Sequence, residues 1–307
     1  MSRQTFCRRA SVSLLACFAA TTAHATNYVR SYLVNDVLLP TTPAEASSYA
    51  IDVDGDGFAD NNFGQLLAVL SAQGFDFLGP MDTAVASGSI VHLVNLQSTD
   101  KLFKNDPAAQ ATWCIGVPTA APPLFNGTDH PSCADTSGTF VAALSGGSFT
   151  SAAPASTSNP ISVDFELALG TSNIALTVLN ARLSFTTNAA GNISVGQING
   201  SIRHTDLLNT FAPAMAAACN ASIQSNPSSN TSNTCKGLFD HGCTGFPGYS
   251  ADGQIEVCEV VENSLISTLM APDVQVADGG SMVAANSIGF RFTAIAYDRV
   301  FANGFEP

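Results

Sequence analysis

The stretch Ile161-Ser-Val163-Asp-Phe165-Glu-Leu167-Ala-Leu169 alternates apolar residues with mainly polar ones. Successive side chains of a β-strand point to opposite faces, so this pattern predicts a strand with one buried face. The next apolar run shifts its phase between Val178 and Leu179, which predicts a β-bulge. A turn over residues 188–192 then leads to an apolar run over 193–204. Together these runs predict a long hairpin in the middle of the chain.

Further strands and helices are expected on both sides of this hairpin. Alternating or apolar runs predict strands over 28–39, 90–96 and 288–296 and a short one near Trp113. Helical spacing of apolar residues predicts helices over 63–70 and 257–269. A second short helix is expected over 75–87, and Asp206 is expected to cap a helix that begins at Leu207 and has Pro213 near its middle. The sum is an α+β fold with a mainly antiparallel, sandwich-like sheet and several packed helices. The loop-rich region 98–160 is a candidate boundary between subdomains.

The N-terminus combines a basic start, a short apolar run and a small-residue ending. Three arginines precede the apolar run 10–20, and Ala23-His-Ala25 follows it. These parts are typical of a secretory signal peptide, so we expect residues 1–25 to be removed and residues 26–307 to form a single exported domain. The alternative is Leu14-Leu-Ala-Cys17, which resembles a lipobox and would make an acylated Cys17 the mature N-terminus.

Charge and hydropathy restrict the expected compartment and partners. Without residues 1–25 the chain has 8 basic and 24 acidic residues, a balance that disfavours nucleic acid and anionic membranes as partners. No later segment is long and apolar enough for a transmembrane helix. We therefore expect the protein in the periplasm, on the outer-membrane surface or outside the cell, where its partner would be an unidentified extracellular or envelope ligand.

Six cysteines follow the expected signal peptide, an even number that predicts three disulfides in an exported protein. They are Cys114, Cys133, Cys219, Cys235, Cys243 and Cys258. The first two flank a Pro/Gly-rich loop and are expected to pair. The other four allow three pairings. We favour Cys219–Cys258 enclosing Cys235–Cys243, because residues 224–234 read as a flexible insert that needs a crosslink. The expected fold is thus disulfide-stapled.

The strongest chemical signal is Asp52-Val-Asp54-Gly-Asp56-Gly-Phe58-Ala-Asp60. Aspartates at positions 1, 3 and 5 with glycine at position 6 let three carboxylates turn inward around one hard cation. The Phe58 carbonyl stands at position 7 and Asp60 at position 9. Without a cation, four carboxylates this close would repel one another. The spacing predicts a Ca²⁺ site formed by all five residues; the alternative is a solvated turn that only starts the following helix.

This loop resembles the calcium loops in the β-propeller of integrin α subunits and the first nine positions of an EF-hand or dockerin loop. An EF-hand has a bidentate glutamate at position 12, where this chain has Phe63. That departure indicates a weak, structural site. A second stretch, residues 248–259, keeps Gly253 and Glu259 at positions 6 and 12 but has Gly248 at position 1. We expect it to be a degenerate loop that keeps only the turn.

Three segments, Tyr49–Leu70, Asp252–Asp273 and Ser287–Ala296, together resemble a group of uncharacterised secreted bacterial proteins and lipoproteins. In that group an Asp-x-Asp-Gly-Asp-Gly-x-x-Asp-Asn loop opens a helix, and a Pro-Asp-Val segment precedes the last strand. The tail Phe301–Pro307 resembles the short Gly-Phe-Glu endings of some exported proteins. The resemblance implies export, and no activity follows from it.

The sequence shows no catalytic constellation. It has no Gly-x-Ser-x-Gly elbow, no His-Glu-x-x-His motif and no dinucleotide fingerprint. His92 and His204 lie in apolar strands and are expected to be core or edge residues, while Asp164 and Glu166 are expected on the solvated side of a strand. These patterns favour a calcium-stabilised, non-enzymatic surface or extracellular protein that serves adhesion, envelope structure or ligand binding. The alternative is a secreted hydrolase whose residues meet only in the fold.

Overall fold

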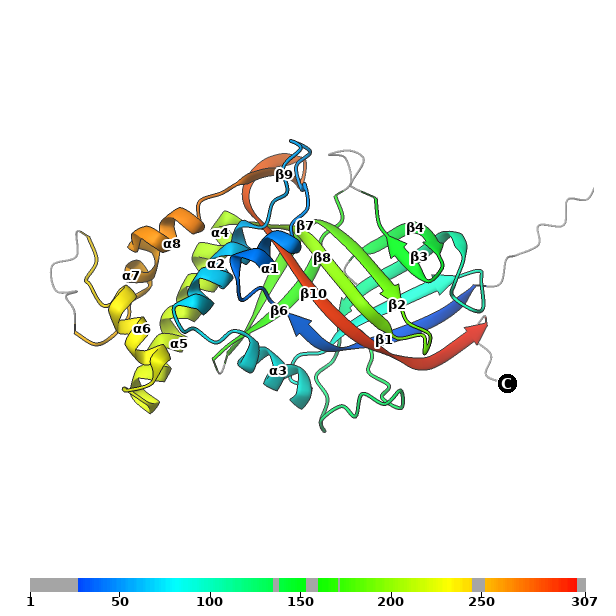
Figure 1. Ribbon diagram of the computed structural model, residues 1–307, viewed down its shortest axis with the longest axis horizontal. Coiled ribbons are helices and arrows are strands. Elements are labelled where there is room, and N and C mark those ends of the chain that lie inside the picture. Colours follow the sequence, from blue (N-terminus) through cyan, green and yellow to red (C-terminus); the bar gives the residue numbers. More distant parts are fainter. Residues whose placement is uncertain (1–26, 135–137, 153–159, 171, 245–251, 303–307) are drawn as a thin grey trace, which may run out of the picture.

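The computed structural model describes residues 27–134, 138–152, 160–170, 172–244 and 252–302 (Figure 1). All strand pairings in these ranges are antiparallel. The strands are β1 (Tyr28–Leu38), β2 (His92–Ser98), β3 (Asp106–Ile115), β4 (Thr139–Ser145), β5 (Ser148–Thr150), β6 (Val163–Leu169), β7 (Ser172–Thr187), β8 (Ile193–Arg203), β9 (Val274–Asp278) and β10 (Ser281–Ala302). The region 98–160, which was expected to be loop-rich, therefore contains β4, β5 and a long strand, β3, where only a short one was predicted.

The strands form a closed ring. They follow the order β1-β2-β3-β4-β5-β7-β8-β10, and β10 returns to pair with β1. Two further strands lie outside this ring, β6 beside β7 and β9 beside β10. The structure confirms the mainly antiparallel, disulfide-stapled α+β fold and adds the ring closure, because the first and last strands of the chain become neighbours.

The predicted hairpin is formed by β7 and β8, and its bulge lies one residue beyond the expected point. The register shifts between Leu179 and Arg182, where Asn180 has a φ of 49°. Gly200 faces this bulge on β8, and a Cβ there would lie 2.5 Å from the Leu179 carbonyl oxygen. Glycine at this position therefore lets the bulged strand approach its partner closely.

The helices are α1 (Pro43–Ser48), α2 (Asn62–Ala72), α3 (Leu78–Ser87), α4 (His204–Asp206), the π-helical turn η1 (Leu207–Phe211), α5 (Ala212–Ser225), α6 (Asn230–Phe239), α7 (Val257–Glu262) and α8 (Ser264–Leu269). Helices α5 to α8 form the end of the molecule opposite β3 and β4 (Figure 1). Pro213 lies in the first turn of α5, where its missing N–H is tolerated. The predicted stripe over 257–269 is divided at Asn263, whose side chain caps α8.

The main core fills the ring and continues under the helices. On β6, the side chains of Val163, Phe165 and Leu167 have no exposed surface, while Asp164 and Glu166 are half-buried. The predicted alternation is thus confirmed. Its buried face packs on large aromatic residues of other strands. They include Trp113, Phe140, Phe149, Phe290 and Phe292.

Three cysteine pairs lie at disulfide distance, with Cα–Cα separations of 5.5 to 5.7 Å. Cys114–Cys133 is confirmed. The favoured nesting of the other four is wrong, because the pairs are Cys219–Cys235 and Cys243–Cys258. The expected flexible insert 224–234 instead contains the end of α5 and the start of α6. Helix α6 packs against α5 and brings Cys235 next to Cys219.

Among the described residues, no helix combines the length and the apolar character needed to cross a membrane. The expected signal peptide with Cys17 lies outside the described residues, as do residues 303–307 of the tail and residues 248–251 of the second loop.

Candidate metal centre

The Asp52–Asp60 loop is closed and anchored at both ends. Ile51 and Asp60 form an isolated antiparallel bridge, in which the Asp60 N–H donates to the Ile51 carbonyl oxygen at 2.8 Å. Between them, the Val53 side chain is buried against β7, β9 and β10, where it contacts a cluster that includes Leu179 and Val276. The buried Val53 side chain therefore anchors the loop to the sheet.

Glycine conformation lets the chain turn twice in this loop. Gly55 and Gly57 have φ values of 88° and 92°, a region that residues with a Cβ rarely adopt. Nothing lies within 4 Å of a Cβ built at either position. Glycine is thus required for its backbone conformation, as the loop spacing predicted for Gly57. The two turns direct the flanking aspartates to one side of the loop.

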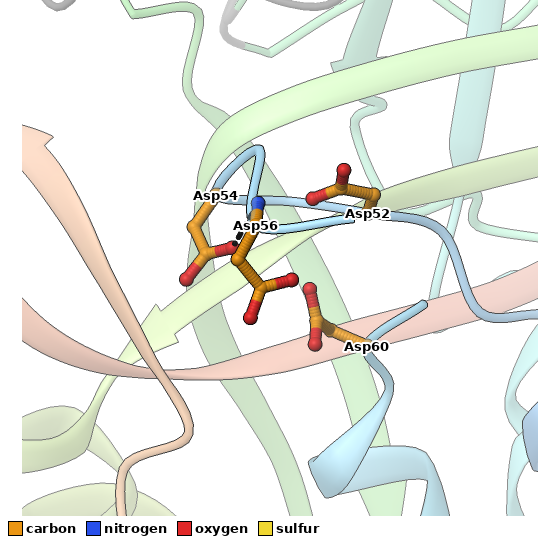
Figure 2. A group of neighbouring side chains, drawn as sticks. All are labelled: Asp52, Asp54, Asp56 and Asp60. Atoms are coloured by element: carbon orange, nitrogen blue, oxygen red, sulfur yellow. Dashed lines mark hydrogen bonds between the residues drawn. The ribbon is translucent and has the colours of Figure 1, made fainter. Parts of the chain in front are cut away.

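The four predicted aspartates converge. Asp52, Asp54, Asp56 and Asp60 each offer a carboxylate oxygen, and these four oxygens all lie within 4.8 Å of one another. Figure 2 shows the four side chains gathered on one side of the turn. Calcium binds oxygen at about 2.4 Å, so two ligands on opposite sides of one ion are about 4.8 Å apart. The separations therefore fit four oxygens around a single calcium ion.

Backbone amides hold each carboxylate in place. Asp52 accepts from the N–H groups of Gly55 at 2.6 Å and Gly57 at 3.0 Å. The other three accept one N–H each, from residues 56, 58 and 53 respectively. Asp54 Oδ2, Asp56 Oδ2 and Asp60 Oδ1 accept no hydrogen bond from the described residues. These three oxygens keep their lone pairs for another ligand.

The negative charge of the loop has no direct counter-ion among the described residues. Burial raises the pKa of Asp60, as do the charges of Asp54, Asp273 and Asp56, against a lowering by the Val53 amide. The pKa of Arg182 is lowered by burial and raised by the nearby Asp52. Arg182 nevertheless forms no ion pair, since the salt bridges within the described ranges both belong to Arg203. A divalent cation would supply the missing positive charge.

The residue that follows the loop fixes it to the last strand. Asn61 is buried, and its side chain makes four hydrogen bonds. The amide nitrogen donates to the carbonyl oxygens of Ala46 at 2.9 Å and Gly289 at 3.2 Å, and Oδ1 accepts from Gly64 at 3.1 Å and Gly289 at 2.7 Å. Asn61 is therefore both the N-cap of α2 and a link between α1 and β10. Sequence reasoning missed this role, although asparagine before an amphipathic helix is a capping signal.

Asn62 extends this connection to the region before β9. Its backbone N–H donates to the Ser287 hydroxyl at 2.7 Å, and its side chain donates to the Ala271 carbonyl oxygen at 2.9 Å. The Ser287 hydroxyl in turn donates to the Asp273 carboxylate. The three segments that carry the resemblance described above therefore meet at one point. Hydrogen bonds thus connect the end of the loop to the junction of α2, the segment after α8, and β10.

Phe58 has its side chain 74% exposed, and its N–H donates to Asp56 at 2.8 Å. Its carbonyl oxygen stays a predicted ligand. The second loop differs from the first: Glu259 is completely buried and accepts the N–H groups of His241, Gly242 and Glu256. Within the described ranges, only the four aspartates of the first loop form a cluster able to hold a metal.

The histidines do not gather with acids and hydroxyls. His92 is buried between the rings of Trp113 and Phe165, with centroid distances of 5.1 and 5.2 Å, and burial lowers its pKa to about 3. His204 begins α4, at the end of β8. His130 contacts the Tyr297 ring edge-on, and His241 is exposed. Four cavities on the described part of the chain have linings without a histidine.

Two cavities on the described chain lie beside features already named. One of about 470 Å³ is polar and includes Asp60, Asn62 and Asp273 in its lining. Another of about 380 Å³ is mainly apolar and lies between α5 and the start of α3. The metal loop therefore borders a polar depression, and the helical end carries an apolar one.

Comparisons with known proteins give no relative. No family model matches the chain, and searches of curated proteins and of solved structures find no match to it either. The function therefore has to be argued from the residues and the geometry of this chain.

Proposed function

We propose that this is an exported, calcium-stabilised, non-enzymatic surface or extracellular protein. In this proposal one Ca²⁺ ion is held by the carboxylates of Asp52, Asp54, Asp56 and Asp60 and by the Phe58 carbonyl oxygen. Its part is structural: it neutralises the clustered charge and orders the junction of α2, α8 and β10. Adhesion, envelope structure and ligand binding are the roles that such a protein would serve.

The observation that carries the proposal is the convergence of four carboxylate oxygens within 4.8 Å. Like charges at such separations repel each other by about 1 kcal/mol per pair in water and by more where the groups are partly buried. The fold nevertheless holds the carboxylates together through five backbone N–H groups and the buried Val53. A bound divalent cation would turn this repulsion into attraction.

The disulfides support the exported location. Three cysteine pairs lie at bonding distance, and such bonds persist mainly outside the cytoplasm. A calcium loop without the glutamate at position 12 agrees with the same location. Extracellular modules bind calcium with dissociation constants of about 10⁻⁴ to 10⁻³ M, close to extracellular calcium concentrations.

The hydrolase alternative has less support from the structure. It needs a nucleophile beside a base that is oriented by an acid. Of the candidate bases, His92 is enclosed between two aromatic rings, and no histidine lines the four cavities considered above. Asp164, one of the strand carboxylates, accepts from the Thr177 hydroxyl at 2.8 Å, as a structural side chain would.

The test is thermal unfolding of the purified protein, first with excess EDTA and then with calcium. Calcium at 10 mM should raise the melting temperature by roughly 3 to 10 °C, because it binds only the folded chain. Isothermal titration should show one site per chain. An unchanged melting temperature together with no heat of binding would refute the calcium site.

A matched pair of variants separates the loop from general charge effects. Asp56→Asn removes one proposed ligand charge but keeps the oxygen that accepts the Phe58 N–H, and it should abolish most of the calcium response. Asp76→Asn removes the same charge from an exposed acid in the turn before α3 and keeps the acceptor for the Gly79 N–H. The Asp76 variant should respond to calcium like the wild type, and an equal loss in both would contradict the assignment.

A further inference from the structure

A second polar cavity, remote from the metal loop in sequence, lies against β1. It has a volume of about 430 Å³ and is lined by parts of β1 and β10, by the β7–β8 turn and by the loop inside the Cys114–Cys133 disulfide. Its polar lining includes Arg30, Asn126 and Asn192, and its apolar lining includes Phe125, Ile295 and Ala296. The size is that of a small-molecule site.

Arg30 brings a positive charge to this cavity without a carboxylate to balance it. Its guanidinium carbon lies 4.4 Å from the centre of the buried Phe103 ring, and its side chain also interacts with the buried Tyr32 hydroxyl, while its Nε is buried without a hydrogen-bond partner among the described residues. Arg30 forms no salt bridge within the described ranges. Arg30 shares this lack of an acidic partner with Arg182, whose Nε is also buried without a hydrogen-bond partner, but only Arg30 lines this cavity.

Two asparagines, Asn126 and Asn192, line the same cavity. Asn126 Oδ1 accepts from the N–H of Thr128 at 3.0 Å and from its hydroxyl at 2.6 Å. Asn192 Oδ1 accepts from the Ala296 N–H at 2.9 Å. These bonds use the amide oxygens and leave both Nδ2 groups without an acceptor among the described residues. The lining therefore includes an arginine and two asparagines whose amide N–H₂ groups have no acceptor, and no carboxylate of the described chain lines the cavity.

The apolar part of the lining is held in a strained backbone. Phe125 has a φ of 51°, which is rare for a bulky residue. The Asp129 carboxylate holds this conformation by accepting the N–H groups of Leu124 at 2.8 Å and Phe125 at 2.7 Å. Such strain persists where the surrounding structure fixes it, and it concentrates at ligand-binding positions.

We propose that this cavity binds a small organic carboxylate. Its two oxygens would face the Arg30 guanidinium and the Nδ2 groups of Asn126 and Asn192, and its apolar body would lie against Phe125 and Ile295. One arginine balances one carboxylate charge, and its planar fork matches two carboxylate oxygens. A doubly charged phosphate would keep an unbalanced charge in an already acidic protein. The site is independent of the calcium proposal.

The binding test is a titration of the purified protein, in low-chloride buffer with calcium present throughout, with benzoate, butyrate and inorganic phosphate. Two-dimensional NMR of the Arg Nε–H and Asn side-chain groups would report the site. Benzoate or butyrate should shift the signals of Arg30, Asn126 and Asn192 saturably, and phosphate should not. No saturable shift with either carboxylate, or saturation by phosphate alone, would overturn the proposal.

Variants make the test specific. Asn192→Asp keeps the oxygen that accepts the Ala296 N–H but replaces the free donor with a negative charge, so binding should fall at least tenfold while the melting temperature stays within a few degrees. Arg30→Gln should weaken binding about tenfold to a hundredfold. Arg182→Gln is the control, since Arg182 is also half-buried with an unpartnered Nε but lies outside this cavity.

The variant results decide the proposal in both directions. Wild-type affinity in Asn192→Asp, or an equal loss in Arg30→Gln and Arg182→Gln, would show that the cavity is not the binding site. If Arg30→Gln folds poorly, Asn126→Asp takes its place. Like Asn192→Asp, it replaces an amide donor with a negatively charged oxygen, here at an exposed position. It keeps the acceptor for Thr128 and should also weaken binding at least tenfold.

Discussion

The Asp52–Asp60 loop and the turn around Gly253 are built from the same kinds of residues, yet they stabilise their carboxylates in opposite ways. In the turn, the Glu259 carboxylate is buried and accepts three backbone N–H groups, from His241, Gly242 and Glu256. The neighbouring Glu256 carboxyl group interacts with it, and burial together with the Glu259 charge raises the pKa of Glu256. In the loop, four carboxylates share five N–H groups and face one another.

This difference teaches that the supply of donors, more than the number of acids, distinguishes a closed turn from a candidate cation site. A carboxylate that accepts three N–H groups needs no further positive charge. The acids of the first loop retain oxygens without donors, and their mutual repulsion persists. In the second loop, backbone amides surround the Glu259 carboxylate where a metal ion would otherwise supply positive charge.

The largest expected effect on stability comes from removing the Glu259 carboxylate, which accepts three backbone N–H groups. Glu259→Ala would leave three N–H groups without their acceptor beside the Cys243–Cys258 disulfide, and it should lower the free energy of unfolding by about 3 to 5 kcal/mol. Glu259→Gln keeps one acceptor oxygen and should lose less. Urea unfolding measures both. Equal losses in EDTA and in calcium are expected, and a loss that calcium reverses would assign a metal to this turn.

His92 is a buried side chain with few hydrogen-bond partners, in contrast to Glu259. Its effect on stability should therefore depend on pH. Its Nε2 accepts the Glu166 N–H at 3.1 Å, and burial lowers its pKa to about 3 from 6.5. Between pH 6.5 and pH 3 the unfolded chain therefore binds a proton that the folded chain excludes, so stability falls as the pH falls. At about 1.4 kcal/mol per pH unit, the loss is roughly 3 kcal/mol by pH 4.

The His92→Gln variant isolates this contribution from that of the carboxylates. Glutamine keeps an acceptor but does not titrate, so the stability difference between wild type and variant should shrink steadily as the pH is lowered from 6.5 to 4. Urea unfolding at several pH values provides the measurement. Parallel pH profiles for the two proteins would contradict the assignment of an uncharged, buried His92.

The smallest expected effect changes its sign with calcium. Asp54→Asn keeps the acceptor for the Asp56 N–H and removes one of four like charges. In EDTA the variant should be more stable than the wild type by up to about 1 kcal/mol, because repulsion is relieved. In 10 mM calcium it should be less stable by a similar amount, because a ligand is lost. Thermal unfolding under both conditions would show the crossing, and its absence would mean that the loop behaves as an ordinary solvated turn.

Short-range features of the fold were readable from single segments of sequence. The alternation over 161–169 predicted β6, because side-chain direction in a strand repeats every two residues. The helical spacing after Asn62 predicted α2, and the phase shift after Val178 located the bulge to within a residue. The loop spacing predicted the four converging aspartates, because all of them lie within nine residues.

Features that join distant segments needed the tertiary structure. The pairing of β1 with β10 closes the ring across more than 250 residues, and no local pattern specifies such a partner. The same holds for Cys219–Cys235, which depends on α6 folding back on α5, a helix hidden in a polar segment that reads as flexible. Arg30, Asn126 and Asn192, which line one cavity, also come from three separate parts of the chain.

The sequence by itself determined the strand and helix periods, the conformation of the aspartate loop and the number of disulfides, because these depend on neighbouring residues or on simple counts. Only the tertiary structure decided the ring closure, the cysteine partners, the amides that satisfy Glu259 and the cavity beside Arg30. The physical reason is that contacts between distant segments are set by how whole elements pack, and packing depends on shapes that no short stretch of sequence contains.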